Sequence, residues 1–271
     1  MYILIAGATG GIGRAIAHRL KQTIPDVTLI GTCRQLPASA TLPDTGAKSD
    51  AIDHWLVVDL TDDASVATLA QTLSDQFGYI NHVINAVGLL HTADQQPEKT
   101  VQKIEPDFFL QNMQVNVLPS LLLARYCAPL LKQASRLTAG EGVQTGKAST
   151  PMNALTGNGT QVFATVSAKV GSIEDNRLGG WYSYRSSKAA LNMGLKTLSI
   201  EWQRTLPSAC VVALHPGTTD TALSAPFQAR VPAEQLFSPA KTAQYLVDVV
   251  ASLTPKDTGS FIAFDGERLP W

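Results

Sequence analysis

Short apolar runs alternate along the chain with longer stretches in which apolar residues recur every three or four positions. The runs predict strands at 2–6, 27–32, 54–58, 81–86, 161–167, 208–214 and 260–264. The periodic stretches predict helices at 12–22, 62–76, 107–133, 182–205 and 239–252. Strands that alternate with helices are typical of parallel sheets. The pattern therefore predicts an α/β fold, a doubly wound parallel sheet of about seven strands (a Rossmann fold), formed by a single domain over 1–271.

The order of the elements also sorts the irregular segments. Right-handed connections place all strand-to-helix turns at one edge of such a sheet, where ligands bind. Segments 87–106 and 217–238 follow strands, so we expect them to overhang that edge, with 217–238 as the substrate lid. Segment 134–160 is rich in Ala, Gly, Ser and Thr and leads from a helix into a strand. We expect it to be a flexible insertion at the other edge, without a catalytic part.

The composition argues against several classes of protein, among them nucleic-acid-binding, membrane and disulfide-rich proteins. The 21 basic and 22 acidic residues nearly balance, which argues against a nucleic-acid or anionic-membrane surface. Charged residues make up 16% of the chain, against roughly 25% in an average soluble protein, so we expect a homo-oligomer. The three cysteines have no spacing typical of a metal site or a disulfide framework. Without an apolar run of membrane length or a signal peptide, the expected location is the cytoplasm.

A glycine-rich turn follows the first predicted strand directly. Gly7-Ala8-Thr9-Gly10-Gly11-Ile12-Gly13 also opens the first predicted helix. Glycines at such a turn allow the backbone N–H groups to approach a diphosphate, and the helix N-terminus adds partial positive charge. The position between strand and helix therefore predicts a dinucleotide site.

The residue after the second predicted strand bears on the choice of dinucleotide. NAD-binding folds place an acidic residue about 20 positions beyond the turn, but that count leads here to Cys33 and its neighbour Arg34. A guanidinium can pair with a 2′-phosphate, which favours NADP(H), while NAD(H) stays possible. The alternative is that Arg34 is a surface charge without a ligand.

Tyr184 and Lys188 lie four residues apart and therefore on one face of the predicted helix 182–205. A nearby ammonium stabilises a phenolate and lowers the pKa of a tyrosine from its usual value near 10. The pair is therefore a candidate for proton transfer. Tyr182 has no basic residue at the same spacing, and on spacing alone a chance pair remains the alternative.

With these motifs the chain resembles the short-chain dehydrogenases/reductases of the single-domain type, and the resemblance covers nearly its whole length. It rests on the glycine turn, Asp59-Leu60, Asn85-Ala86-Val87-Gly88, Asn116-Val117, Tyr184 with Lys188, and Pro216-Gly217. The runs 170–176, 179–184 and 265–271 are similar to the C-factor-like members and to the sniffer-type carbonyl reductases. Gly7, Gly10 and Gly13 also match the spacing of the extended members, but the 54 residues after Gly217 are too few for their second domain.

The resemblance implies a role for each matched residue. Tyr184 would be the proton donor in reduction, Lys188 would hold the nicotinamide ribose, and Asn116 would anchor a water next to Lys188. The remaining cofactor contacts that it implies are Gly7, Thr9, Gly11, Ile12, Gly13, Arg34, Asp59, Leu60, Asn85, Ala86, Gly88, Pro216, Gly217, Thr219 and Thr221. It also favours a homodimer or homotetramer.

The serine that contacts the substrate carbonyl in this family is less clear. Its usual spacing to a following glycine is not met, because Gly171 lies three residues after Ala168 and not after Ser167. Adjacent strand residues face opposite sides, so a one-residue shift would turn Ser167 away from the substrate. We prefer Ser167 and keep Ser172 as the alternative.

The leading hypothesis is an NADP-dependent oxidoreductase that transfers hydride between a nicotinamide and a small apolar carbonyl or alcohol, with Tyr184 as general acid/base. The alternative is a C-factor-type protein that binds NAD(P) in signalling or interaction with little turnover. A serine hydrolase is excluded because the chain has no G-x-S-x-G motif.

Overall fold

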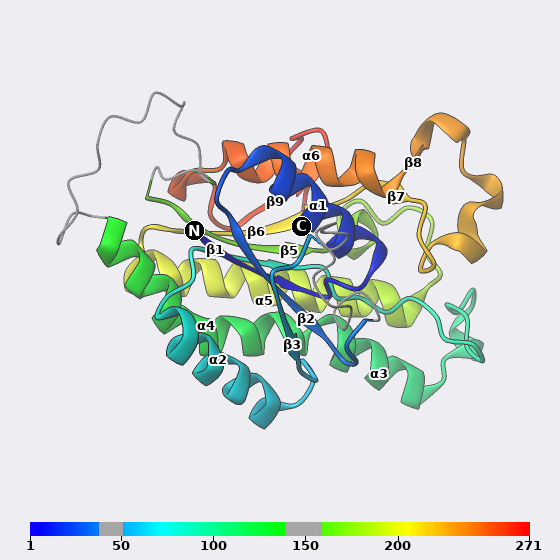
Figure 1. The fold of residues 1–271 in the computed structure, drawn as a ribbon. Coiled ribbons are helices and arrows are strands. Elements are labelled where there is room, and N and C mark those ends of the chain that lie inside the picture. Colours follow the sequence, from blue (N-terminus) through cyan, green and yellow to red (C-terminus); the bar gives the residue numbers. More distant parts are fainter. Residues whose placement is uncertain (38–50, 139–154, 156–158) are drawn as a thin grey trace.

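A parallel sheet forms the centre of the molecule (Figure 1). The computed structural model describes residues 1–37, 51–138, 155 and 159–271. Within them seven strands form one sheet in the order β3-β2-β1-β4-β5-β6-β9, each pair parallel. The strands are β1 (Tyr2–Ala6), β2 (Thr28–Cys33), β3 (His54–Val57), β4 (His82–Asn85), β5 (Gln161–Val166), β6 (Ala209–His215) and β9 (Ser260–Ala263). The predicted doubly wound fold is confirmed.

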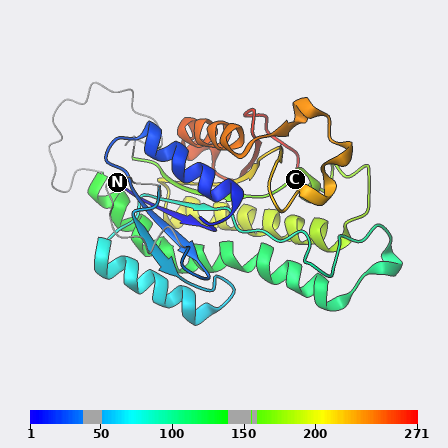
Figure 2. The same ribbon diagram turned by 45° about the vertical axis from the view of Figure 1, so that its right-hand side comes forward.

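Helices cover both faces of this sheet (Figures 1 and 2). The helices of one face are α1 (Gly11–Thr23) and α6 (Pro239–Ser252), which pack against each other. Those of the other face are α2 (Asp63–Phe77), α3 (Pro106–Asn116), α4 (Leu118–Thr138) and α5 (Tyr182–Thr205). The order of strands reverses between β1 and β4, so the crevice at their carboxyl ends is where this fold binds ligands.

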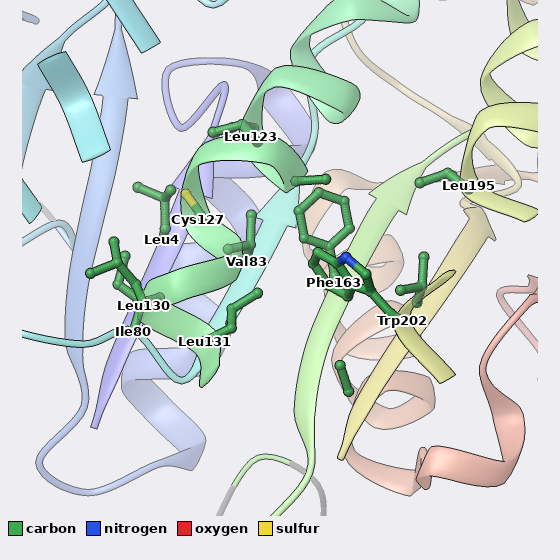
Figure 3. Close-up of a cluster of buried hydrophobic side chains, with 14 of the residues drawn as sticks. Leu4, Ile80, Val83, Leu123, Cys127, Leu130, Leu131, Phe163, Leu195 and Trp202 are labelled. Carbon is green, nitrogen blue, oxygen red and sulfur yellow. The ribbon is translucent and has the colours of Figure 1, made fainter. Parts of the chain in front are cut away.

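Successive residues of a strand pack into two separate hydrophobic cores, one on each face of the sheet. In β1, Ile3 and Ile5 belong to the cluster under α1 and α6, whereas Leu4 and Ala6 belong to the cluster under the other helices. Figure 3 shows part of the second cluster, where Phe163 of β5 lies against Trp202 of α5 with their ring centroids 5.5 Å apart. Because Ile3, Leu4, Ile5 and Ala6 are all buried, the sequence of this strand is a continuous apolar run.

The prediction of one long helix at 107–133 is wrong, because the chain forms two helices there. Helix α3 ends at Asn116 and α4 begins at Leu118. Pro119 has no N–H to donate to Val115, so a continuous helix would lack a bond at this point. The break leaves Asn116 at a helix end, where its side chain reaches the backbone of Leu89.

Two irregular segments differ in how much the structure describes. Helix α4 continues to Thr138, so the first five residues of the expected insertion 134–160 are helical. Residues 139–154 and 156–158 lie outside the described part, and Leu155 is buried in the core. The lid segment 217–238 contains β7 (Thr218–Thr219) and β8 (Leu236–Phe237), which pair with each other, and a short helix at Ala225–Arg230. No helix in the described ranges has the length and apolar content needed to cross a bilayer.

Candidate active site

Two connected hollows lie at the carboxyl ends of the strands. The groove, of about 360 Å³, lies over the ends of β1 to β4. The pocket, of about 260 Å³, lies between the start of α5, the end of β6 and the lid segment. Both are bordered by Ala86, Val87 and Gly88, so they form one continuous site. Together they offer space for an extended ligand in the groove and a second, smaller molecule in the pocket.

The structure brings most of the predicted site residues together. Predicted residues that line the groove are Gly7, Thr9, Arg34, Asp59, Leu60, Ala86 and Gly88. Predicted residues that line the pocket, besides Ala86 and Gly88, are Ile12, Ser167, Tyr184, Lys188, Pro216, Gly217 and Thr219. Predicted residues that line neither are Gly11, Gly13, Asn85, Asn116 and Thr221. These five support the walls, as described below.

The glycine turn has the shape that a diphosphate requires. Gly7 has a positive φ of 74°, and a Cβ atom there would lie 3.1 Å from the Val87 side chain. A Cβ on Gly13 would overlap the Gly7 carbonyl oxygen. No side chain caps α1 at Gly10, and its first turn has no acidic residue. The first N–H groups of the helix are therefore free to bind an anion, which fits the diphosphate of a dinucleotide.

Charged and polar groups lie where the adenosine half of a dinucleotide would bind. Arg34 is exposed beside the groove, directly after β2. Asp59 Oδ1 accepts hydrogen bonds from the backbone N and Oγ1 of Thr61, and these bonds, together with the Arg34 charge, hold the pKa of Asp59 below its usual range. Thr32, which the sequence analysis missed, accepts from Gly7 N at 3.2 Å and also lines the groove.

Asn85 fixes the floor between groove and pocket without lining either. Its Oδ1 accepts from Val87 N at 3.0 Å, and its Nδ2 donates to Ser120 Oγ at 2.8 Å. Ser120 Oγ lies 3.2 Å from Thr165 Oγ1 of β5. This buried chain of hydrogen bonds links the segment after β4 to α4 and β5. It thereby fixes the position of the Val87 backbone between groove and pocket.

Tyr184 and Lys188 lie one helical turn apart on α5, and both are at least 93% buried. Lys188 Nζ donates to Val166 O at 3.1 Å and lies 5.7 Å from the centroid of the Tyr184 ring. Burial lowers the pKa of Lys188 to about 8, so its ammonium persists at neutral pH. Burial raises the pKa of Tyr184. The expectation of a lowered tyrosine pKa is therefore wrong for the protein alone, because burial of the phenol outweighs the ammonium.

Asn116 is held at the end of α3 beside this pair. Its Nδ2 donates to Leu89 O at 2.8 Å and lies 2.9 Å from Ser187 Oγ, while its Oδ1 accepts from Leu89 N at 2.7 Å. A Cβ on Gly88 would lie 3.6 Å from Asn116 Oδ1 and 3.7 Å from Lys188 Nζ. Asn116 thus borders the space next to Gly88 and Lys188 and positions the loop after β4.

The two candidate serines lie in different places. Ser167 follows the last residue of β5, stays in register through its N–H bond to Leu214 O at 2.7 Å, and lines the pocket with Tyr184. Ser172 Oγ instead donates to Trp271 O at 3.2 Å, outside the pocket lining. The geometry thus favours Ser167 over the alternative. Ser167 Oγ is also 2.6 Å from Asn192 Oδ1, a partner that the sequence analysis missed.

The segment after β6 closes the pocket from the other side. Gly217 has a φ of 71°, and a Cβ there would meet the Phe237 ring at 2.7 Å. Thr219 Oγ1 lies 2.8 Å from Thr242 Oγ1 of α6, which anchors the segment. Thr221 does not line the pocket; its side chain packs so closely on Gly11 that a Cβ there would lie 2.6 Å away. The glycine turn and the lid segment are therefore in direct contact.

The mouth of the pocket is mostly aromatic. The ring centroids of Trp181 and Phe227 lie 5.0 Å apart, and those of Phe227 and His91 lie 5.8 Å apart. Trp181 also lines the pocket, and Leu89 lines the groove. Phe227 was missed because its loop has no periodic pattern. His215, whose pKa burial lowers to about 4, is neutral in the pocket wall.

Comparisons with known proteins agree with this fold. The family model of short chain dehydrogenases matches residues 1–146. The 1-hydroxy-2-glutathionyl-2-methyl-3-butene dehydrogenase of Rhodococcus sp. (strain AD45) is 28% identical over 270 residues, 99% of each chain. The C-signal protein of Myxococcus xanthus is 35% identical over 109 residues, 40% of this chain and 60% of that protein.

Among solved structures, the carbonyl reductase Sniffer of D. melanogaster matches with a TM-score of 0.79 and 26% identity. The match covers 100% of this chain and 99% of that one. The chain therefore belongs to the short-chain dehydrogenase/reductase family, and it is an oxidoreductase that binds a nicotinamide cofactor.

Proposed function

We propose that this protein is an NADP-dependent carbonyl reductase that acts on small apolar ketones or aldehydes. The observation that carries the proposal is that Ser167, Tyr184 and Lys188 share the wall of a pocket that opens into the dinucleotide groove. Apolar side chains make most of the remaining wall, including Leu90, Val170 and Leu223. When bound, the cofactor supplies the hydride.

The residues of the chain supply the proton and hold the carbonyl. A phenol whose pKa is raised stays protonated at neutral pH, so Tyr184 serves as the acid that protonates the carbonyl oxygen. Ser167 donates a hydrogen bond to the same oxygen and stabilises the charge that develops there. The Lys188 ammonium, fixed by Val166 O, holds the cofactor ribose and favours the phenolate that proton transfer leaves behind.

Arg34 supports the choice of NADP(H). Its guanidinium lies beside the groove after β2, where it can pair with a 2′-phosphate, while NAD(H) remains the weaker ligand. The lid segment 217–238 covers the pocket through Phe227, whose ring packs on Trp181 at the start of α5. We assign to these rings the contact with the apolar part of the substrate.

The experiment is Tyr184→Phe, measured as NADPH oxidation with a panel of aromatic and aliphatic carbonyls that includes benzil. We expect kcat to fall by at least about 10²-fold, as is usual when a general acid is removed, while NADPH affinity stays within about threefold. Tyr182→Phe, at an exposed tyrosine two residues earlier, is the control and keeps full activity. A Tyr184→Phe enzyme with more than about a tenth of the wild-type rate contradicts the role.

The match to the C-signal protein supports a second candidate, a cofactor-binding signalling or interaction protein. That candidate predicts tight NADPH binding without turnover of any carbonyl in the panel. The presence of Ser167, Tyr184 and Lys188 around one pocket favours the reductase.

A further inference from the structure

Asn192 lies behind the candidate catalytic serine, on the same helix as the tyrosine and the lysine. Tyr184, Lys188 and Asn192 follow each other at four-residue steps on α5, so they share one face of the helix. Asn192 is 3% exposed, and its amide is 2.6 Å from Ser167 Oγ. It touches Ser167 from the side of α5, while Ser167 itself lines the pocket.

One orientation of this amide leaves a buried N–H group without a partner among the described residues. With Oδ1 toward the serine, the Ser167 hydroxyl donates its hydrogen to Asn192, and Asn192 Nδ2 is buried without a hydrogen-bond partner among the described residues. Buried N–H groups without partners are rare in folded proteins. The serine hydrogen is then also unavailable to a carbonyl oxygen in the pocket.

A half-turn of the amide gives Nδ2 a partner and frees the serine hydrogen, while Oδ1 takes the buried position that Nδ2 held. Nδ2 then donates to Ser167 Oγ across the same short contact, since amide oxygen and nitrogen are nearly equal in size. A hydroxyl can accept one hydrogen bond while donating another. The serine hydrogen is therefore free to turn toward the pocket, where the substrate carbonyl needs a donor.

We propose that Asn192 is a positioning residue for the reaction, whose Nδ2 donates to Ser167 Oγ and so directs the serine hydroxyl hydrogen at the substrate carbonyl. This inference rests on the proposed reductase function. Asn192 acts only through Ser167, because neither the substrate nor the cofactor site includes it. Removing it should therefore matter only as long as Ser167 is present.

A double-mutant cycle tests this dependence. Asn192→Leu keeps the size of the side chain and removes its polar atoms, and it is compared with Ser167→Ala and with the double variant, using benzil and NADPH. We expect each single variant to lower kcat about 10- to 100-fold, with little change in KM or in NADPH affinity. The kcat of the double variant should lie within about threefold of the kcat of Ser167→Ala.

A matched control changes another polar residue of α5 to leucine. Gln203→Leu, at an exposed position far along the helix, should keep the wild-type kcat. The inference is overturned when Asn192→Leu retains full activity, or when its loss multiplies with that of Ser167→Ala, because a general structural defect would add to the loss of the serine.

A neutron structure of the perdeuterated protein decides the amide orientation without any turnover. We expect two deuterons on the Asn192 nitrogen, one of them directed at Ser167 Oγ. A deuteron on Ser167 Oγ that points at an Asn192 oxygen overturns the inference. A wild-type protein that reduces no carbonyl in the panel would refute the proposed function, and the neutron result would still decide the orientation of this contact.

Discussion

At the scale of single residues, the candidate site contains a buried cation, Lys188, which pairs with no carboxylate among the described residues. Burial alone lowers the pKa of Lys188 from 10.5 to about 8, and its Nζ donates a hydrogen bond to the backbone carbonyl of Val166. Below pH about 8 both the folded and the unfolded chain carry the charge, which the folded state solvates less well. Lys188 therefore costs stability at neutral pH, and this cost shrinks as pH rises from about 8 to 10.5.

Lys188→Met should accordingly make the protein more stable and less active. We expect a gain of about 1–3 kcal/mol in the free energy of unfolding at pH 7, offset in part by the lost bond to Val166 O. The gain should fall toward zero near pH 10.5. Urea unfolding at pH 7, 9 and 10.5 measures it, and a gain that does not depend on pH would argue against the buried charge as its cause.

Arg34 is a second single residue with a measurable consequence. If its guanidinium binds a 2′-phosphate, Arg34→Ala should lower kcat/KM for NADPH about 10- to 100-fold, which corresponds to losing one charge-assisted contact. The value for NADH should change less than about threefold, because NADH has no phosphate at this position. Arg14→Ala is the control, since Arg14 belongs to α1 and lines a separate hollow between α1 and α6, outside the groove. If Arg34→Ala lowers kcat/KM equally for NADPH and NADH, the role of Arg34 is structural and not phosphate binding.

The sequence predicts contacts within one helix far better than contacts between segments. The four-residue step places Tyr184 and Lys188 on one face, and one more step would have led to Asn192. The direction of the tyrosine pKa could not be derived in this way, because it depends on burial by other segments. Likewise, Ser167 points into the pocket because of its bond to β6, which no local spacing reveals.

At the scale of elements, the start of α5 is held by a distant carboxylate. Glu98 is buried, accepts from Ser183 N at 3.1 Å and from the Ser183 hydroxyl, and its carbonyl oxygen accepts from Trp181 N at 2.5 Å. Trp181 has a positive φ of 53°, an unfavourable conformation for a bulky residue. The segment after β4 thus fixes the first turn of the helix that carries Tyr184.

Glu98→Ala should weaken both the fold and the reaction. It leaves the buried Ser183 N–H without its acceptor and removes a negative charge from a helix N-terminus, so we expect a loss of about 1–3 kcal/mol in the free energy of unfolding. A shift of the first turn of α5 would also lower kcat. Glu98→Gln keeps an acceptor for Ser183 N, so its loss in the free energy of unfolding should be smaller than that of Glu98→Ala. The control is Glu105→Ala, since the Glu105 side chain does not cap α3. If urea unfolding shows an equal loss of stability for Glu105→Ala and Glu98→Ala, the hydrogen bonds of Glu98 are not the cause.

Elements whose boundaries depend on local chemistry were predictable, and the others were not. The α5 and α6 ranges match the prediction because their apolar periodicity and Pro239 mark their limits. The break between α3 and α4 was missed, although Pro119 is the local signal for it. Pairing of β7 with β8 depends on how the lid segment folds back, which two-residue strands cannot indicate.

At the scale of the whole molecule, the sheet places its chemistry at one edge and an acid-sensitive group at the other. His82 begins β4, at the amino end of the strands, and its Nδ1 accepts from Val162 N of β5 at 3.1 Å. Burial, with a smaller effect of the N-terminal ammonium, lowers the pKa of His82 to about 3. The neutral imidazole thus joins β4 to β5 at the edge of the sheet opposite the candidate catalytic pocket.

Acid should therefore destabilise the fold before it titrates this histidine in the native state. The unfolded chain binds the proton below pH about 6.5, whereas the folded protein binds it only near pH 3, so stability falls as pH decreases through this range. The loss from His82 alone amounts to about 3 kcal/mol at pH 4. His82→Asn places an amide oxygen near the position of Nδ1, keeps an acceptor for Val162 N and removes the titrating group.

We expect the variant to show a flatter decline of the free energy of unfolding between pH 6.5 and 4 in urea titrations. His215, with its pKa lowered to about 4, is present in both proteins and cancels in the comparison. His54→Asn, at an exposed histidine of β3, should leave the slope of the wild type unchanged. Equal slopes for His82→Asn and wild type would mean that acid unfolds the molecule through other groups, with the β4–β5 contact intact.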